Sequence, residues 1–236
     1  MKNNTKTIRL AHLLSQRGVA SRRAAEGIIA DGEVKVHGVV VTDPAFPVNP
    51  EDNDIVVAGN PLPVQVAHRY IALNKPPGFL SNFTKSNENG RLLGELITLE
   101  ERLFVAGRLD LASHGLLIIT TDGEWANHVM HPRYEKEKEY LVRFRGAKVR
   151  EAVKRLAAVT FTEKGKKFRA VAVRADGLNV RVILKEGRNR QIRRLAEKAE
   201  LRIKDLARIR IGSIQLGRLK EGHWRKLNQK EIKDFL

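Results

Sequence analysis

The chain has 236 residues, enough for one or two domains, and 42% of them are hydrophobic, enough for a folded core. It contains no cysteine, which excludes a disulfide scaffold, a thiolate zinc site, an iron–sulfur cluster and a cysteine nucleophile. The net charge of +17 favours a polyanionic partner, nucleic acid before a membrane surface. The sequence has neither a secretory signal nor an apolar run long enough to cross a bilayer. We therefore expect a cytoplasmic protein that makes no membrane contact.

The positive charge is unevenly distributed. Residues 1–66 hold seven basic and seven acidic side chains, so the whole surplus falls in residues 67–236. It is densest in residues 181–226, with 15 basic and five acidic side chains, and we expect this tract to line a substrate cleft. The proline-rich stretch Asn60-Pro61-Leu62-Pro63 indicates a linker. The sequence therefore predicts two domains, residues 1–65 and 66–236.

The first domain is predicted to contain two helices followed by a hairpin, with Ser21 as N-cap of the second helix and His37-Gly38 as the turn. Arg22 and Arg23 begin that helix, where positive charge opposes the helix dipole, and Arg17 is expected near the same edge. A phosphate partner would relieve this conflict; the alternative is a pair of exposed arginines that repel each other weakly. The expected elements are helices at residues 8–16 and 22–30 and strands at residues 34–36 and 39–41.

Several stretches of this domain resemble the S-four-type (alpha-L) RNA-binding module found on ribosomal proteins, tRNA synthetases and RNA-modifying enzymes. They are Arg9-Leu10, residues 18–26 (GVASRRAAE), residues 32–38 (GEVKVHG) and residues 54–57 (DIVV). The resemblance spans about residues 8–60 and implies binding of structured RNA. His12 departs from the pattern, which often has lysine there, and so removes one fixed charge.

The second domain alternates predicted strands and helices. Strands are expected at residues 69–73, 103–106, 116–121, 139–144, 168–174 and 179–184, and helices at residues 124–131, 148–157 and 189–200. This mixed order, with several hairpins expected between strands, predicts an α+β fold and argues against a doubly wound sheet. Because no glycine-rich phosphate-binding fingerprint precedes a helix, we expect no nucleotide cofactor.

Two local patterns in this domain contain side chains suited to chemistry. In Gly107-Arg108-Leu109-Asp110, an arginine and a carboxylate lie between two apolar runs. This is either a charged turn that joins two strands or a carboxylate held at a strand end, within reach of a flipped base. In residues 185–196 several arginines fall in the first turns of a predicted helix, with Asn189 as a possible cap. Their mutual repulsion indicates an anion opposite them, either phosphates or an internal carboxylate.

Two further patterns are weaker. Asn74-Lys75-Pro76-Pro77-Gly78 forms a rigid basic loop after a strand, and Tyr140 begins a strand beside a charged run, where a tyrosine is usually part of the core. His128 and His131 have a spacing found in metal sites, but no third ligand is evident, so we expect no metal. Ser113-His114 are adjacent only in sequence, which does not make a hydrolase pair.

Taken in order, these patterns resemble the RNA pseudouridine synthases, specifically the RsuA-like branch that carries an N-terminal S-four-type module and acts on ribosomal RNA. The matching stretches are residues 75–78 (KPPG), 107–110 (GRLD), 115–117 (GLL), 121–123 (TDG), 131–133 (HPR), 138–140 (KEY) and 186–194 (EGRNRQIRR). The resemblance covers about residues 8–228. Ser113 departs slightly, because threonine is usual there, but it keeps the hydroxyl. The implied fold is a pseudouridine synthase domain with a central mixed, mainly antiparallel sheet.

The resemblance also implies roles for individual residues. Asp110 would be the catalytic carboxylate, Arg193 its ion-pair partner and Tyr140 the residue that stacks on the flipped base. Arg108 would fill the gap left by the extruded nucleotide, and Leu184 would form the apolar floor. The remaining expected RNA contacts are Lys75, Arg188, Arg190, Arg194, Arg22 and Arg23.

The expected reaction needs neither a redox step nor a cofactor. We expect a monomer that converts a uridine of ribosomal RNA, with large-subunit RNA preferred over the alternatives of small-subunit RNA and tRNA. A ribosome-assembly factor that binds RNA without turnover is the alternative to an enzyme.

Overall fold

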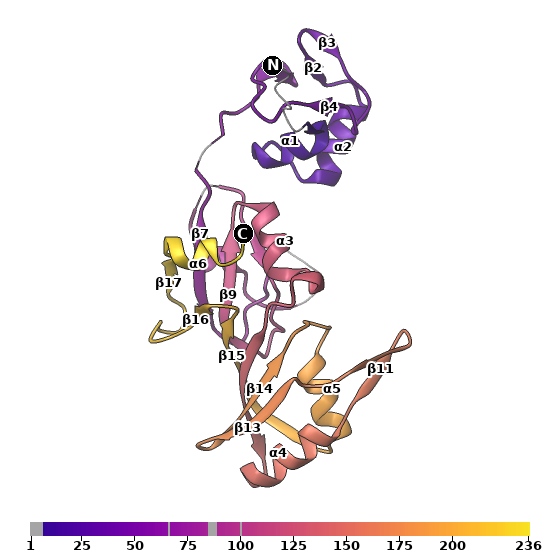
Figure 1. Cartoon of the computed structure of the whole chain (residues 1–236). Helices are drawn as coiled ribbons and strands as arrows, with labels where there is room; N and C mark the ends of the chain where they lie inside the picture. The colour runs from indigo at the N-terminus through magenta and orange to yellow at the C-terminus, as the bar shows by residue number, and fades with distance from the viewer. Residues whose placement is uncertain (1–6, 66, 85–88, 100) are drawn as a thin grey trace. The chain divides into compact units, whose positions relative to one another are not determined.

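The computed structural model describes residues 7–65, 67–84, 89–99 and 101–236. The chain divides into two compact units, Met1–His68 and Arg69–Leu236 (Figure 1), and each unit buries hydrophobic side chains of its own. None of the helices in the described ranges has the length and apolar character that a membrane crossing needs.

The first unit combines two helices with short antiparallel strands. Its helices are α1 (Leu10–Gln16) and α2 (Arg22–Ala30). Its strands are β1 (Ile8–Arg9), β2 (Val34–Val36), β3 (Val39–Val40), β4 (Pro47–Val48), β5 (Ile55–Val57) and β6 (Asn60–Pro61). β1 pairs with β4, and the other four form a sheet in the order β3-β2-β5-β6. The helix predicted at residues 8–16 begins two residues later, because Ile8 and Arg9 pair with β4.

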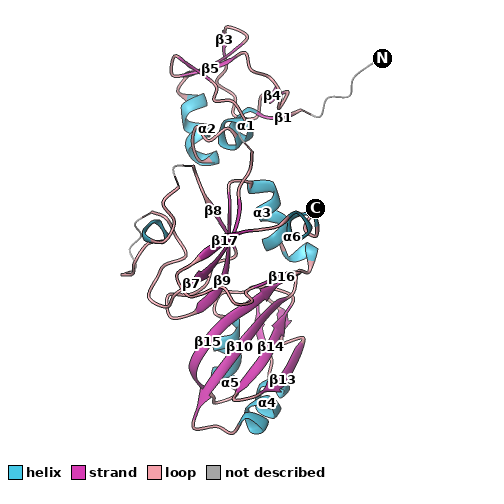
Figure 2. Cartoon of the chain, turned by 90° about the vertical axis from the view of Figure 1, so that its left-hand side faces the viewer, coloured by secondary structure: helices cyan, strands magenta, loops and turns pink. Residues whose placement is uncertain are grey.

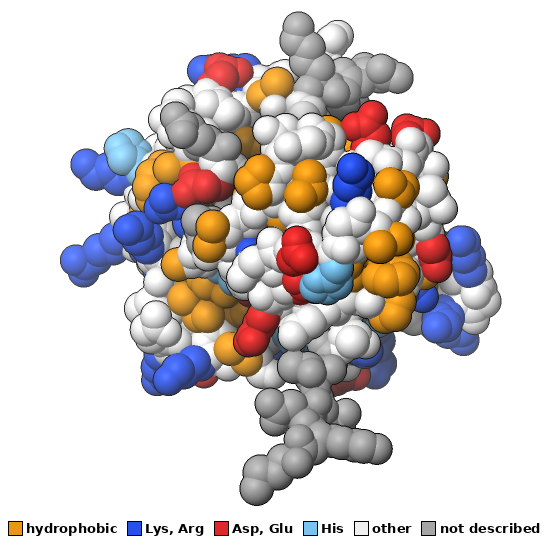
Figure 3. Space-filling model, turned by 90° about the horizontal axis from the view of Figure 1, so that it is seen from above, with side chains coloured by type: hydrophobic (Ala, Val, Ile, Leu, Met, Phe, Trp, Pro, Cys, Tyr) orange, Lys and Arg blue, Asp and Glu red, His pale blue; other side chains and the backbone are white. Residues whose placement is uncertain are grey.

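The predicted second helix and hairpin are confirmed. The Ser21 hydroxyl accepts a hydrogen bond from the Ala24 amide at 3.0 Å, which caps α2. His37 and Gly38 both have positive φ, 49° and 77°, as a two-residue turn that matches the twist of the strands requires. Val39 and Val40 remain 67% and 51% exposed on this hairpin, and Figure 3 shows hydrophobic side chains among acidic and polar ones on the face it views.

The second unit is built on a nine-stranded sheet, in keeping with the predicted α+β class. The strands are β7 (Tyr70–Lys75), β8 (Phe104–Ala106), β9 (His114–Thr120), β10 (Lys138–Arg145), β13 (Ala172–Asp176), β14 (Asn179–Leu184), β15 (Arg202–Ile211), β16 (Ile214–Gln215) and β17 (Trp224–Lys226). Their order is β13-β14-β10-β15-β9-β7-β17, with β16 paired to β15 and β8 to β9. The sheet is mixed but mainly antiparallel, because of these pairings only β9 with β15 is parallel.

The parallel contact between β9 and β15 is short. It consists of two residue pairs, Ala207 with His114 and Arg208 with Gly115, whereas the antiparallel neighbours β10 and β15 pair along eight residues of each strand. We call this short contact the seam. It joins two halves of the sheet: β13, β14, β10 and β15 on one side and β9, β8, β7 and β17 on the other.

Helices cover the sheet in two groups. They are α3 (Gly123–Met130), α4 (Val149–Ala158), α5 (Gln191–Lys198) and α6 (Gln229–Lys233), and a hairpin of β11 (Phe161–Glu163) and β12 (Lys166–Phe168) lies between α4 and β13 in the chain. The 3₁₀ turns are η1 (Leu93–Glu95) and η2 (Pro132–Tyr134). In Figure 2, α4 and α5 lie behind the strands β15, β10, β14 and β13.

The core explains why β9 is a continuous apolar run. Leu117 and Ile119 pack into the cluster shared with α4 and α5, whereas Leu116 and Ile118 pack into a second cluster around Trp125 of α3. A strand covered on both faces cannot alternate between apolar and polar residues, which is why this segment has the most uniformly apolar sequence in the unit.

Two features differ from the prediction. The strand predicted at residues 168–174 is two strands, β12 and β13, which pair with β11 and β14 respectively. The ten-residue strand β15 was not predicted, although it lies inside the sheet between β10 and β9. Its sequence, RIKDLARIRI, looks like a solvated basic tract, but Arg208 is 2% exposed and Arg210 is ion-paired to Glu137 and Glu139.

Candidate active site

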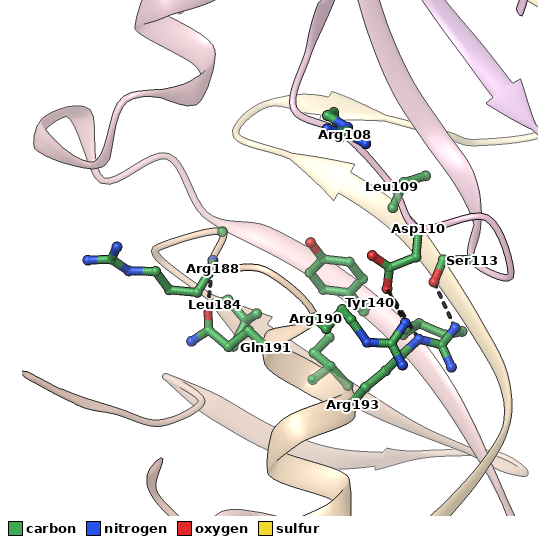
Figure 4. Close-up of a pocket in the computed structure, with 13 residues that line it drawn as sticks. Arg108, Leu109, Asp110, Ser113, Tyr140, Leu184, Arg188, Arg190, Gln191 and Arg193 are labelled. Atoms are coloured by element: carbon green, nitrogen blue, oxygen red, sulfur yellow. Dashed lines mark hydrogen bonds and ion pairs between the residues drawn. The ribbon is translucent and has the colours of Figure 1, made fainter. Parts of the chain in front are cut away.

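A pocket open to solvent lies where the loop after β8 faces β10 and the segment between β14 and α5. The lining residues drawn in Figure 4 include Arg108, Asp110, Ser113, Tyr140, Leu184, Arg188, Arg190 and Arg193. The structure therefore brings together seven of the residues that the sequence singled out, from four separate segments of the chain, and adds Ser113 to them.

The Asp110 carboxylate is held by a guanidinium. Arg193 Nε donates to Asp110 Oδ2 at 3.2 Å, and Arg193 Nη2 donates to Ser113 Oγ at 2.9 Å. A second cation lies nearby, with Arg190 Nη1 3.9 Å from the same carboxylate oxygen. The Asp110 side chain is still 28% exposed, so the carboxylate is both ion-paired and accessible from the pocket.

The start of α5 aims Arg193 at the pocket. Arg190 adopts a left-handed conformation (φ 52°), and α5 begins after it at Gln191. The predicted cap at Asn189 is wrong: instead the Gln191 side chain accepts from the Arg188 amide at 3.1 Å and donates to Glu186 at 2.9 Å. Positive charge is unfavourable in the first turn of a helix, and for Arg193 the Asp110 carboxylate offsets that cost.

The loop that carries Asp110 is fixed by backbone contacts. The Ser81 hydroxyl accepts from the Leu109 amide at 2.9 Å and donates to the Leu109 carbonyl at 2.7 Å. The Ser113 amide donates to the Asp110 carbonyl at 3.0 Å. Ser81 is 6% exposed and was not singled out by the sequence, because a lone serine after a basic loop gives no signal of such a role.

Tyr140 is at once a core residue and a wall of the pocket. It is 8% exposed, belongs to the hydrophobic cluster of α4 and α5, and lies opposite Val182 of β14. Leu184, 2% exposed, lies at the end of the same strand pair. Figure 4 shows the Tyr140 ring and the Asp110 carboxylate facing the same space.

Two of the residues predicted to contact RNA have partners inside the fold. Lys75 is completely buried, and its ammonium donates to the Pro76 carbonyl at 2.8 Å, so it cannot reach a phosphate outside the fold. Burial lowers the Lys75 pKa to about 8, against the raising effect of nearby Asp110. Arg194 is not a pocket residue: it pairs with Glu163 at 2.8 Å and lies 4.0 Å over the Phe161 ring, which holds the β11–β12 hairpin against α5.

In the first unit the arginines divide into two roles. Arg22 and Arg23 are exposed in the first turn of α2. Arg17, expected beside them, is 8% exposed and donates to the carbonyls of Pro50 at 2.9 Å and Pro63 at 3.0 Å. It therefore ties α1 to the end of the domain and offers no charge to a ligand.

The structure also places the residues considered for a hydrolase pair and for a metal site. His114 Nε2 lies 2.9 Å from Asp205, whereas the Ser113 hydroxyl accepts from Arg193, so these two neighbours have different partners. The His128 ring packs edge-on against Tyr134, with 4.5 Å between centroids. Within the described residues, no three His, Asp or Glu side chains gather as they would to hold a metal ion.

The chain is similar to known proteins in both sequence and fold. The profile of RNA pseudouridylate synthases matches residues 69–198, and that of the S4 domain matches residues 8–54. An uncharacterized RNA pseudouridine synthase of Aquifex aeolicus is 41% identical over 230 residues, covering 95% of this chain and 92% of that protein. Ribosomal large subunit pseudouridine synthase B of Bacillus subtilis is 33% identical over 237 residues, covering 95% and 94%. A crystal structure of a pseudouridylate synthase matches with a TM-score of 0.67 and 27% identity, covering 97% of this chain and 100% of that one.

The chain thus combines a small S4 domain of helices and a hairpin with an α+β domain that has an arginine-lined pocket. This combination is that of a two-domain RNA-binding protein. The chain belongs to the RNA pseudouridylate synthase family, in the group that carries an S4 domain ahead of the synthase domain.

Proposed function

We propose that this chain converts a specific uridine of large-subunit ribosomal RNA to pseudouridine, with Asp110 as the catalytic carboxylate. The observation that carries the proposal is the ion pair of Asp110 with Arg193 at 3.2 Å in an open pocket that Tyr140 also lines. The choice of RNA is supported by the Bacillus subtilis relative, whose name assigns it to the large ribosomal subunit.

The reaction breaks the bond between the ribose and N1 of uracil, turns the base, and forms a bond to carbon 5. A proton leaves carbon 5 and N1 gains one, so no net oxidation occurs. Asp110 must be ionised for this role, and Arg193 and Arg190 both favour the charged carboxylate. Ser113 holds the far end of the Arg193 guanidinium and so fixes the direction of the ion pair.

The target nucleotide must leave its stack to reach the pocket, and unstacking costs a few kcal/mol. In our proposal the Tyr140 ring stacks on the flipped base, Leu184 forms the apolar floor, and Arg108 occupies the gap left in the RNA. Arg188 and Arg190, both exposed at the pocket edge, contact the flanking phosphates. Arg188 also lies 4.8 Å over the Phe168 ring, which restricts its position before RNA arrives.

The first domain, residues 1–65, supplies the grip on folded RNA, and residues 66–236 perform the chemistry. Arg22 and Arg23 are the proposed phosphate contacts of the S4 domain. We propose that the active form is a cytoplasmic monomer.

Two measurements test this proposal. Pseudouridines are mapped in total RNA from cells with and without the gene, and purified Asp110→Asn protein is assayed on ribosomal RNA from the deletion strain. We expect one large-subunit site to disappear on deletion, and the variant to bind RNA like the wild type but form no product. Loss of a small-subunit or tRNA site would correct the substrate, and turnover by the variant would refute the role of Asp110. An unchanged map, with RNA binding retained, would favour an assembly factor.

A further inference from the structure

The side chain of Arg208 is buried in the middle of β15 and bonds to backbone carbonyls. It is 2% exposed. Its Nε donates to the Leu116 carbonyl at 2.8 Å, Nη2 to the Gly107 carbonyl at 2.7 Å, and Nη1 to the Arg108 carbonyl at 3.4 Å. No carboxylate among the described residues forms an ion pair with it.

These three carbonyls lie on both stems of the loop that carries Asp110. Gly107 and Arg108 come directly before Leu109 and Asp110, and Leu116 follows once the chain has entered β9. One guanidinium therefore bonds to the incoming and the outgoing strand of this loop. It does so from the other half of the sheet, because β15 and β9 meet only at the seam.

The backbone at the seam is packed as closely as glycine allows. Arg208 lies opposite Gly115, whose φ is 97°, and a Cβ there would be 2.3 Å from the Arg208 carbonyl oxygen. Side chain and main chain of Arg208 thus both fix the loop.

The location is costly for a cation. Lys75 and Lys138 are also buried, and burial first, then the charge of Arg208, lowers the Lys138 pKa to about 8. Buried charges contribute little net stability, and apolar residues of similar size often replace them without loss. An arginine at this position is therefore better explained by geometry than by stability, because only its planar fork reaches three carbonyls at once.

We propose that Arg208 is the positioning residue of Asp110: it clamps both stems of the catalytic loop and so sets the carboxylate against Arg193 and Tyr140. The inference rests on the proposed role of Asp110. It assigns to Arg208 no contact with RNA, since it is buried beneath the loop.

The test compares Arg208→Lys with Arg210→Lys in the full-length protein. Both arginines belong to β15, but Arg210 pairs with Glu137 and Glu139 and does not contact the loop. Lysine keeps the charge of Arg208 but cannot span three carbonyls. Since a misplacement of about 1 Å costs on the order of 100-fold in rate, we expect Arg208→Lys to lower the single-turnover rate on large-subunit RNA by about that factor. RNA affinity should stay at the wild-type value, and Arg210→Lys should keep the wild-type rate.

Hydrogen exchange separates positioning from general damage. In Arg208→Lys the amides of residues 107–116 should exchange faster, whereas those of α4 should not change. Should Arg208→Lys fail to fold, Gly107→Ala takes its place. It strains a backbone at φ 91° and displaces a carbonyl that Arg208 holds, while the new methyl makes only an ordinary contact, 3.8 Å from Arg208 Nη1.

The outcomes are distinct. A wild-type rate in Arg208→Lys, or in Gly107→Ala where that replaces it, would overturn the inference while Asp110→Asn remains inactive. Equal losses of rate, affinity and α4 protection would show that Arg208 only supports folding, and would overturn it as well. Turnover by Asp110→Asn would instead refute the proposed function on which it rests.

Discussion

Replacing Lys75 with methionine tests how the second unit tolerates a buried charge. Methionine has a similar length, lacks the charge, and forfeits the hydrogen bond to the Pro76 carbonyl. Each pKa unit corresponds to about 1.4 kcal/mol. The fall of the Lys75 pKa from 10.5 to about 8 therefore amounts to about 3 kcal/mol against the folded state at neutral pH. Losing one hydrogen bond costs about 1 kcal/mol. We expect Lys75→Met to raise the free energy of unfolding at pH 7 by about 2 kcal/mol.

The pH dependence gives the sign of the effect. The Lys75 pKa is lower in the folded chain than in the unfolded one, so between pH 8 and 10.5 the unfolded chain binds more protons. The free energy of unfolding from this group therefore rises with pH across that window, and below pH 8 the full penalty remains. Lys75→Met should lose this rise. Lys138, whose pKa is also about 8, provides the matched comparison. Lys138→Met should remove only the part of the rise in the free energy of unfolding that comes from Lys138.

Urea unfolding of the full chain at pH 7 and pH 10 measures this, with tryptophan fluorescence as the signal. Both tryptophans, Trp125 and Trp224, belong to the second unit, so the S4 domain does not contribute to the transition. The reasoning fails if Lys75→Met has a lower free energy of unfolding than the wild type at pH 7 and if that free energy changes between pH 7 and pH 10 as it does in the wild type. The ammonium would then stabilise the fold.

Three further variants test the proposed roles of other arginines. Arg22→Ala with Arg23→Ala should weaken RNA binding and reduce the slope of log affinity against log salt by about one for each lost phosphate contact, whereas Lys35→Ala on β2 should leave it unchanged; an unchanged slope in the double variant would place RNA elsewhere. Arg193→Met should lower the single-turnover rate about 100-fold while RNA affinity persists, and a wild-type rate would show that the pocket carboxylate needs no ion pair. Arg194→Ala should cost about 1 kcal/mol of stability by freeing the β11–β12 hairpin, yet keep the wild-type rate; a slow but stable variant would return it to the site.

Local sequence patterns predicted the elements that have one face toward the core and the other toward solvent. Ser21 and the residues after it define α2, and the alternation of Asn179–Leu184 defines β14, because one side of each faces a core and the other faces solvent. The pattern of β15 did not predict a strand. Arg208 and Arg210 are held inside the fold by carbonyls and carboxylates that are remote in sequence, so the strand's pattern resembles exposed polar chain.

The same limit applies to the site. The resemblance singled out Asp110, Tyr140 and Arg193, and the structure brings them together at one pocket. It could not show that Lys75 is enclosed, since a basic residue before Pro-Pro-Gly looks like a surface loop. Nor could it find Ser81 or Arg208, whose contacts with the loop that carries Asp110 exist only once distant strands have met.

The seam between β9 and β15 has a consequence for how the pocket exists at all. Asp110 is attached to one half of the sheet, and Tyr140 and Arg193 to the other. Two backbone pairs, the Arg208 side chain, the Arg193–Asp110 ion pair and a shared hydrophobic cluster join the two halves. Neither half alone brings these three residues together, so the pocket exists only where the two halves are joined. A ligand that binds only where the two halves are joined stabilises the folded chain by mass action, and a tighter ligand stabilises it more.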